Sequence, residues 1–230
     1  MPARLSPTAL EEEAFLRWVR PPRQGRTREQ LGRILEAAEG LISRRGFDDT
    51  SVVEIARVAG TSVGGFYRRF PTKGALLHAL HERFCAEAKE TASSVLDPAR
   101  WQGVPTLSVF QALVDFLIGI YNERRGLFRA FIVRAITDPT TNKRNRELFE
   151  FLAEKMSALL TERRKDIDHP DPTLGARFVL RMMFGTLNHF LVVADEWNSF
   201  TEKTLRQELA RAFRAYLGVR PPYVAQRRRA

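Results

Sequence analysis

The sequence of 230 residues predicts an all-α protein. Apolar residues recur at intervals of three and four, beginning with Leu31, Ile34, Leu35, Ala38, Leu41 and Ile42. Alternation of apolar and polar residues with the period of two that strands show is missing, and glycines and prolines fall between the apolar stretches. These observations predict helices over residues 27–45, 51–58, 62–68, 73–96, 104–121, 125–136, 140–166, 173–195 and 201–217.

The sequence at the two ends of the chain differs from the helical pattern of residues 27–217. Residues 1–25 form an extension in which residues 8–19 could be helical before Pro21 and Pro22 break the helix. Residues 218–230 form a basic tail that contains prolines and three arginines in succession. Such a tail is more often a solvated end than an arm that binds a partner.

Composition narrows the class of protein. The formal net charge is +10, which suggests an anionic partner such as nucleic acid. The single cysteine, Cys85, allows no internal disulfide, and no run of about 18 apolar residues spans a bilayer, so we expect a cytoplasmic protein without a membrane partner. The four histidines are scattered and no short catalytic, metal or phosphate-binding motif occurs. We therefore expect a protein that is not an enzyme and that holds no metal or cofactor.

Three closely spaced helices near the N-terminus carry the strongest local pattern. Ser51 and Glu54 have the spacing of a capping box at the start of the second helix, and Thr50 precedes them. The turn Ala59-Gly60-Thr61 follows, and Ser62 can cap the third helix. Two short helices joined by a tight glycine turn form a helix-turn-helix, which places its second helix in the major groove of DNA.

The helix that begins at Ser62 has two chemically different sides. We expect Phe66 and Phe70 to face a small core beside Ile55 and Val58. The glycines at 64 and 65 would allow close approach to DNA, Tyr67 can donate to a phosphate, and Arg68 or Arg69 can contact guanine or a phosphate. Lys73 would add a phosphate contact at the start of the next helix. Arg69 could instead form a salt bridge with Asp48 or Asp49.

Residues 50–73, TSVVEIARVAGTSVGGFYRRFPTK, closely resemble the DNA-binding signature of the TetR family of transcriptional regulators. The resemblance begins with residues 34–38 and Gly46-Phe47 and continues to about Phe84. It implies DNA contacts from Thr50, Ser51, Ser62, Val63, Gly64, Gly65, Tyr67, Arg68, Arg69 and Lys73. Val63 and Gly65 stand where many family members carry Lys and Thr, so more of the polar readout would fall to Arg68 and Arg69, with Val63 pressing on a thymine methyl.

The region after residue 72 carries many aromatic residues, enough for a helical core or for a cavity between helices. The resemblance implies that this region senses a small-molecule effector, whose identity the sequence leaves open, and that binding moves the linking helix at 73–96. Candidate ligand contacts are Phe110, Tyr121, Phe128, Arg134, Met156, Met183 and His189. Each of these residues could instead serve the core or an interface.

Residues 178–194 are apolar on nearly all sides, and a helix of that kind must be covered on two faces. The amphipathic stretch 201–217 supplies a second apolar stripe. The arrangement resembles the dimer interface of the family, in which the last two helices pair with their mates. The implied interface residues are Phe178, Arg181, Gly185, Leu187, Asn188, Leu205, Leu209 and Phe213. Alternatively, both helices complete the core of a monomer.

Together these inferences describe four segments: an arm at 1–25, a helix-turn-helix DNA-binding domain at 26–72, a helical ligand-binding and dimerisation domain at 73–217, and the tail at 218–230. The expected protein is a homodimer that binds an inverted-repeat DNA operator as a repressor and is released by a small-molecule effector. Arg20, Arg23, Arg26 and Arg28 could follow the minor groove or belong to a mobile lead-in. The alternatives are an activator or a protein-responsive regulator of the same fold, and a helical enzyme with a basic N-terminal unit.

Overall fold

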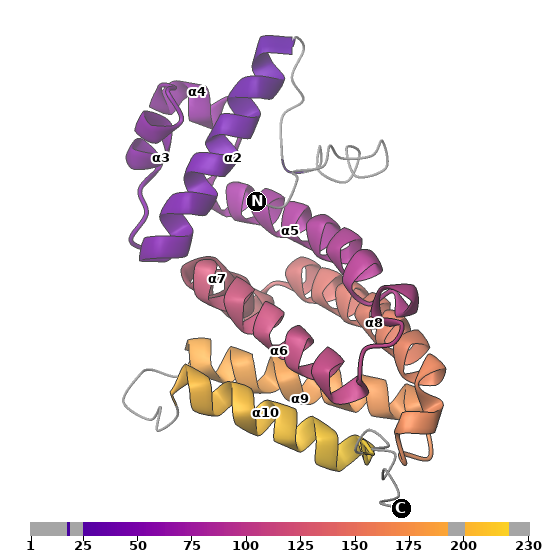
Figure 1. The fold of residues 1–230 in the computed structure, drawn as a ribbon. Coiled ribbons are helices and arrows are strands. Elements are labelled where there is room, and N and C mark those ends of the chain that lie inside the picture. Colours follow the sequence, from indigo (N-terminus) through magenta and orange to yellow (C-terminus); the bar gives the residue numbers. More distant parts are fainter. Residues whose placement is uncertain (1–17, 19–24, 193–200, 221–230) are drawn as a thin grey trace, which may run out of the picture. The chain divides into compact units, whose positions relative to one another are not determined.

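The structure is a computed structural model, and it describes Trp18, residues 25–192 and residues 201–220. All regular structure in this part of the chain is helical, which confirms the predicted all-α class (Figure 1). The α-helices described are α2 (Gly25–Arg45), α3 (Val52–Val58), α4 (Val63–Tyr67), α5 (Lys73–Val95), α6 (Thr106–Glu123), α7 (Arg125–Thr137), α8 (Pro139–Glu162), α9 (Pro172–Val192) and α10 (Glu202–Leu217).

The predicted helix boundaries agree with these bounds to within a few residues, with two differences. The stretch 140–166 divides into α8 and a short 3-10 helix, η2 (Arg164–Asp166), and a second 3-10 helix, η1 (Pro98–Trp101), had not been predicted. The predicted end of α9 at residue 195, and most of the N-terminal extension and basic tail, lie outside the described residues. None of the described helices is long and apolar enough to cross a bilayer.

The chain divides into two compact units. The N-terminal unit comprises Met1–Thr91 and Tyr121–Phe149, and the C-terminal unit comprises Ala92–Ile120 and Glu150–Ala230. This division differs from the domain boundary at residues 72 and 73 that the sequence suggested, because α7 returns to pack against α2. A Cβ atom on Gly126 at the start of α7 would lie 2.2 Å from the carbonyl oxygen of Ile42, so the absence of a side chain there permits the close contact.

The core of the N-terminal unit is formed by α2, α3, α4, α5 and α7. The apolar stripe predicted for α2 is buried, and Phe66 and Phe70 are buried beside Ile55 as expected. Val58 is not part of this core, because its side chain is 51% exposed. Ile55, Ala56 and Ala59 form the inward face of this segment, and Val58 lies at the edge of that face, on the side exposed to solvent.

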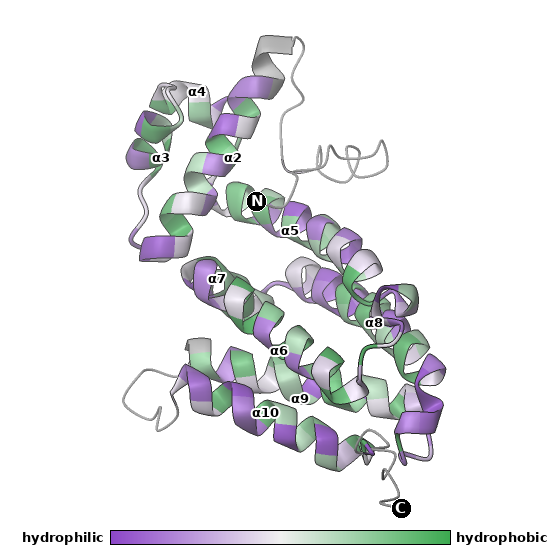
Figure 2. Ribbon diagram, viewed as in Figure 1, coloured by the Kyte–Doolittle hydropathy of each residue, from purple (hydrophilic) through white to green (hydrophobic). Residues whose placement is uncertain are grey.

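The core of the C-terminal unit is formed by apolar residues of α6, α8, α9 and α10, and Figure 2 shows the alternating hydropathy along α10. Arg163 near the end of α8 fixes the start of α6. Its guanidinium donates to the carbonyls of Trp101 at 2.5 Å and Val104 at 2.8 Å and to the Thr106 hydroxyl at 2.9 Å. The Thr106 hydroxyl in turn donates to Asp166 at 2.5 Å. The largely buried guanidinium of Arg163 therefore links the end of α8 to the segment that leads into α6.

Candidate nucleic-acid interface

Helices α3 and α4 form the predicted helix-turn-helix, and α3 begins with the capping box that the sequence indicates. The Ser51 hydroxyl accepts from the Glu54 backbone N–H at 3.1 Å, and the Glu54 carboxylate accepts from the Ser51 N–H at 3.2 Å. Hydrogen bonds from Ser51 to its carboxylate, above all the one from the Ser51 backbone N–H, hold the pKa of Glu54 below its ordinary value. Arg45 at the end of α2 also donates to Glu54 at 2.6 Å, so the start of α3 is attached to α2.

The turn between the two helices is held by three contacts. Gly60 has a φ of +64°, a left-handed conformation that favours glycine. The N–H of Thr61 donates to the carbonyl of Ala56 at 2.9 Å, and the Thr61 hydroxyl accepts from the Gln30 amide at 2.7 Å. Ser62 then caps α4 by accepting from the N–H of Gly65 at 3.0 Å. The direction of α4 is therefore fixed relative to α2 and α3.

Most of the predicted DNA-contact residues are exposed at the helix-turn-helix, and we refer to the exposed ones on α4 and its ends as the α4 surface. Ser62, Val63, Gly64, Tyr67 and Arg68 are exposed on α4 and its ends, as is Ser51 at the start of α3. The Tyr67 ring meets the buried Phe66 ring edge to face, with centroids 5.4 Å apart, so the fold orients the tyrosine. Arg69 is half-buried beside this surface.

Two of the predicted contacts have internal roles instead. The Thr50 side chain is 0% exposed, and its hydroxyl donates to the carbonyl of Gly46 at 2.7 Å, which closes the loop between α2 and α3. Gly65 is buried, and a Cβ atom there would lie 2.3 Å from the Thr61 hydroxyl. The glycine at 65 therefore serves packing against the turn, whereas a Cβ atom on Gly64 would meet only the Ser62 hydroxyl, at 3.9 Å. Neither Thr50 nor Gly65 offers a side-chain surface to DNA.

Lys73, the first residue of α5, borders this surface. Its ammonium lies 4.2 Å from the centroid of the Phe47 ring and 3.4 Å from the carbonyl oxygen of Asp48. The hydroxyl of Thr72 accepts from the N–H of Ala75 at 3.0 Å and so caps α5. A cation next to a helix N-terminus with exposed backbone N–H groups is suited to bind a phosphate.

The predicted ligand residues are divided between the two units. Phe110, Met156 and Met183 are buried in the C-terminal unit, while Tyr121 and Phe128 belong to the N-terminal unit, where their rings stack with centroids 4.4 Å apart. Arg134 and His189 are exposed. Burial raises the pKa of Tyr121, which keeps its phenol neutral.

The predicted dimer residues fall into an exposed group and a buried group. On α9, Phe178 is 49% exposed, Arg181 and Gly185 are exposed, and Asn188 is half-buried. Leu187, Leu205, Leu209 and Phe213 are buried within their own subunit, so they cannot face a partner directly. The reason is that the α10 stripe packs inside the unit, with the Phe213 ring 6.2 Å from that of Phe110. Sequence reasoning missed Leu174, which is exposed one helical turn before Phe178.

Comparison with known proteins identifies the family. Residues 34–80 match the bacterial regulatory proteins of the tetR family, and residues 107–217 match the tetracyclin repressor-like C-terminal domain. The chain belongs to the TetR family. It is therefore a transcriptional regulator, and DNA binding by its helix-turn-helix follows from the same matches. The matches favour this class over the helical enzyme considered as an alternative.

Individual relatives extend the comparison. The transcriptional regulator TtgR of Pseudomonas putida is 37% identical over 92 residues, which cover 37% of this chain and 43% of TtgR. The nucleoid occlusion factor SlmA of Vibrio cholerae is 26% identical over 164 residues, which cover 69% of this chain and 82% of SlmA. The match to YvdT of Bacillus subtilis spans 26% of that protein, so the chain covers only part of some relatives.

Two solved structures share the TetR-family fold with this chain. A TetR-family regulator of Mesorhizobium loti has a TM-score of 0.67 at 22% identity, covering 85% of this chain and 98% of its own. NalD, the secondary repressor of the MexAB-OprM multidrug efflux pump in Pseudomonas aeruginosa, has a TM-score of 0.57 at 23% identity, covering 86% and 99%. At these identities the likeness concerns the fold.

Proposed function

We propose that this TetR-family regulator is a homodimeric repressor that binds an inverted-repeat operator and is released by a small-molecule effector. The observation that carries the proposal is the exposed surface of α4, with its N-terminus capped by Ser62, its turn fixed by Gln30, and Lys73 beside it. Base edges would meet Val63, Gly64 and Arg68. Phosphates would meet Ser51, Ser62, Tyr67, Arg69 and Lys73.

The exposed face of α9 supports the homodimer. Leu174 and Phe178 place apolar surface on the outside of a helix whose other side is already buried, and Gly185 further along offers little bulk. Exposed apolar surface of this kind marks interaction sites. A two-fold dimer presents one α4 to each half of a DNA site, so the operator would be an inverted repeat. The effector would bind the C-terminal region and favour a dimer whose two α4 helices no longer fit.

The operator is tested by selection from random DNA with purified protein. We expect enrichment of an inverted repeat whose half-sites are about one helical turn, or a multiple of it, apart. Transcription from a promoter that contains the selected sequence should fall when the protein is present. Enrichment of no motif, or of a sequence without two-fold symmetry, would contradict the proposal.

Lys73 gives a second test at the same surface. Lys73→Gln should weaken binding to all sequences and reduce the slope of log affinity against log salt by about 0.9 per subunit. Lys165→Gln removes the same charge from an exposed position in η2 and should leave the slope unchanged. Equal effects of the two variants, measured by fluorescence anisotropy, would remove Lys73 from the interface.

A second candidate is a nucleoid occlusion factor, because the match to the nucleoid occlusion factor SlmA spans more of this chain than the match to TtgR. Mapping of bound sites across the source genome separates the two. A few sites in front of genes support the repressor, and many dispersed sites support the second candidate.

A further inference from the structure

Trp18 precedes α2 and packs against the core of the N-terminal unit. Its indole stacks on the imidazole of His78 in α5, with ring centroids 4.0 Å apart and an angle of 16° between the planes. The guanidinium carbon of Arg144 in α8 lies 5.5 Å from the centre of the same indole. One side chain ahead of the helix-turn-helix therefore contacts two helices at once.

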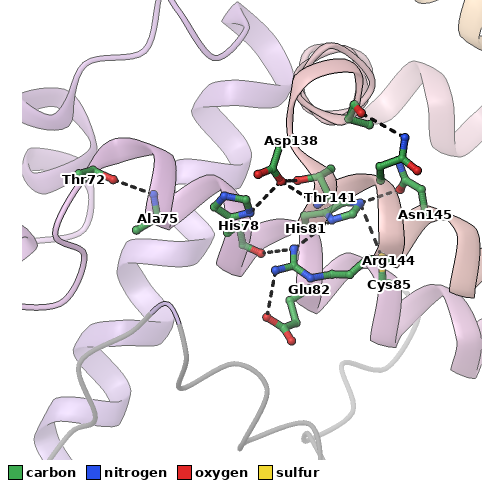
Figure 3. A network of polar contacts seen from close by, with 12 residues as sticks. Thr72, Ala75, His78, His81, Glu82, Cys85, Asp138, Thr141, Arg144 and Asn145 are labelled. Carbon is green, nitrogen blue, oxygen red and sulfur yellow. Dashed lines mark hydrogen bonds and ion pairs between the residues drawn. The ribbon is translucent and has the colours of Figure 1, made fainter.

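The surface that receives Trp18 is built from α5 and α8. Arg144 donates to the carbonyl of His78 at 3.3 Å and to Nδ1 of His81 at 3.2 Å, and it pairs with Glu82 at 3.7 Å. Nε2 of His81 lies 2.8 Å from Oδ1 of Asn145 (Figure 3). The guanidinium that joins α5 to α8 is thus the same group that lies over Trp18.

His78 is buried in this surface, and its ring nitrogen Nδ1 has no hydrogen-bond partner among the described residues. Its side chain is 6% exposed, and Nδ1 lies 3.8 Å from the Asp138 carboxylate, beyond hydrogen-bond distance. Among the described residues neither His78 Nδ1 nor Trp18 Nε1 has a hydrogen-bond partner. Buried polar atoms without partners oppose docking, so ring stacking, the cation over the indole and apolar burial must hold Trp18 in place. Those contacts exist only at the observed spacing of His78 and Arg144.

We propose that Trp18 is an anchor that couples the chain ahead of the helix-turn-helix to the contact between α5 and α8. If α5 separated from α8, His78 and Arg144 would no longer both contact the Trp18 indole. Binding of Trp18 between them therefore stabilises the arrangement in which α5 and α8 are in contact. His78 lies five residues after Lys73, about 7.5 Å along the helix, so the anchor acts close to the end of α5 that borders the α4 surface. The coupling concerns α5 and α8 themselves and does not depend on the proposed repressor function.

The first experiment monitors the anchor directly by fluorescence. The chain holds three tryptophans, so Trp101→Phe with Trp197→Phe leaves Trp18 as the sole indole. In this parent we expect emission at a short wavelength and weak quenching by acrylamide. Arg144→Met should shift the emission to longer wavelength and increase quenching, whereas Arg146→Met, at an exposed position two residues later, should do neither. Emission typical of a solvent-exposed indole in the parent, or equal shifts in both variants, would overturn the proposal.

The second experiment measures coupling by hydrogen exchange. Trp18→Ala should speed exchange in α5 around residues 78–85 and at the start of α8, while α9 and α10 keep their rates, and Trp18→Phe should restore protection because it retains a stacking ring. Unchanged exchange in α5 and α8, or equal acceleration in α9 and α10, would contradict a local coupling. The fluorescence comparison uses folded protein with Trp18 intact, so it decides the anchor even if Trp18→Ala fails to fold. Both measurements are made without DNA, so their failure differs from a failure to select an operator.

Discussion

At the scale of residues, the adjacent glycines of α4 separate packing from recognition. A Cβ atom at position 65 would meet the Thr61 hydroxyl at 2.3 Å, so Gly65→Ala should displace Thr61, break its bond to Gln30 and lower the free energy of unfolding by about 1 to 3 kcal/mol. Gly64 meets nothing closer than 3.9 Å, so Gly64→Ala should keep or raise that free energy, since alanine favours helix by about 1 kcal/mol. Denaturant unfolding measures both.

The variants Gly64→Ala and Gly65→Ala should also differ in their effect on DNA binding. Gly64→Ala should weaken operator affinity because it adds a methyl group to the surface that we propose meets DNA. Gly65→Ala should lower the apparent affinity only to the extent that it reduces the fraction of folded protein. Undiminished affinity of a stable Gly64→Ala protein would show that DNA does not approach α4 at this point.

His81 predicts a pH dependence of stability. Arg144 donates to its Nδ1, so Nε2 carries the hydrogen that Asn145 accepts and the ring is neutral. Burial, the largest cause, lowers the pKa of His81 to about 4 from an ordinary 6.5. Between these values the unfolded chain binds a proton that the folded chain does not, so acid destabilises the fold, by about 2 kcal/mol from pH 7 to pH 5. Below pH 4 both states are protonated and no further loss follows.

Urea unfolding at pH 7 and pH 5 measures this effect. His81→Gln should reduce the difference in unfolding free energy between the two values, and His189→Gln, at an exposed position, should retain it. Burial also lowers the pKa of His78, so the difference should shrink without vanishing. An unchanged difference in the His81 variant would show that the imidazole is not held neutral.

Residue roles were predictable from sequence where the contact is local. Ser51 and Ser62 cap the helices that follow them, and their partners lie three residues away. Gly65 was misread because the hydroxyl that crowds it, that of Thr61, is held in place by the amide of Gln30, which comes from another helix. Thr50 was expected to contact DNA, but its hydroxyl donates to the Gly46 carbonyl in the preceding loop and its side chain is buried.

At the scale of elements, the periodicity of apolar residues located the helices but did not reveal what covers each face. The α10 stripe was assigned in part to a partner subunit, yet Leu205, Leu209 and Phe213 complete their own unit. An amphipathic pattern shows that one face is buried and carries no information on which surface buries it. On α9, which is apolar on both sides, the structure shows that the side with Leu174 and Phe178 remains exposed.

The exposed face of α9 predicts where a single charge disrupts assembly. Phe178→Glu places a carboxylate in the proposed interface and should convert dimers to monomers in analytical ultracentrifugation, because burying an unpaired charge is costly. Ile136→Glu in α7 is the control, since that side chain is 74% exposed and lies outside the proposed interface. Dimers that survive Phe178→Glu, or dissociate equally in both variants, would place the interface elsewhere.

At the scale of the whole molecule, the division into units follows a contact between distant parts of the sequence. Leu127 and Phe131 of α7 share the core of α2 to α5, although about 50 to 60 residues of sequence separate them from Leu80 and Phe70. The sequence shows α7 as one more amphipathic helix, and only Gly126 marks its close approach to α2. The boundary expected at residue 72 therefore follows the end of a motif and not the end of a packed core.

Assembly and recognition meet in one prediction about the operator. If two subunits each read a half-site, the free energy of binding the full inverted repeat includes both contacts, and a monomer retains only one. Selection from random DNA with Phe178→Glu should therefore return a single half-site, bound more weakly and with about half the salt slope of the unaltered protein. Ile136→Glu should return the full repeat. Recovery of the full repeat by monomeric Phe178→Glu protein would show that symmetry in the DNA does not arise from the α9 contact.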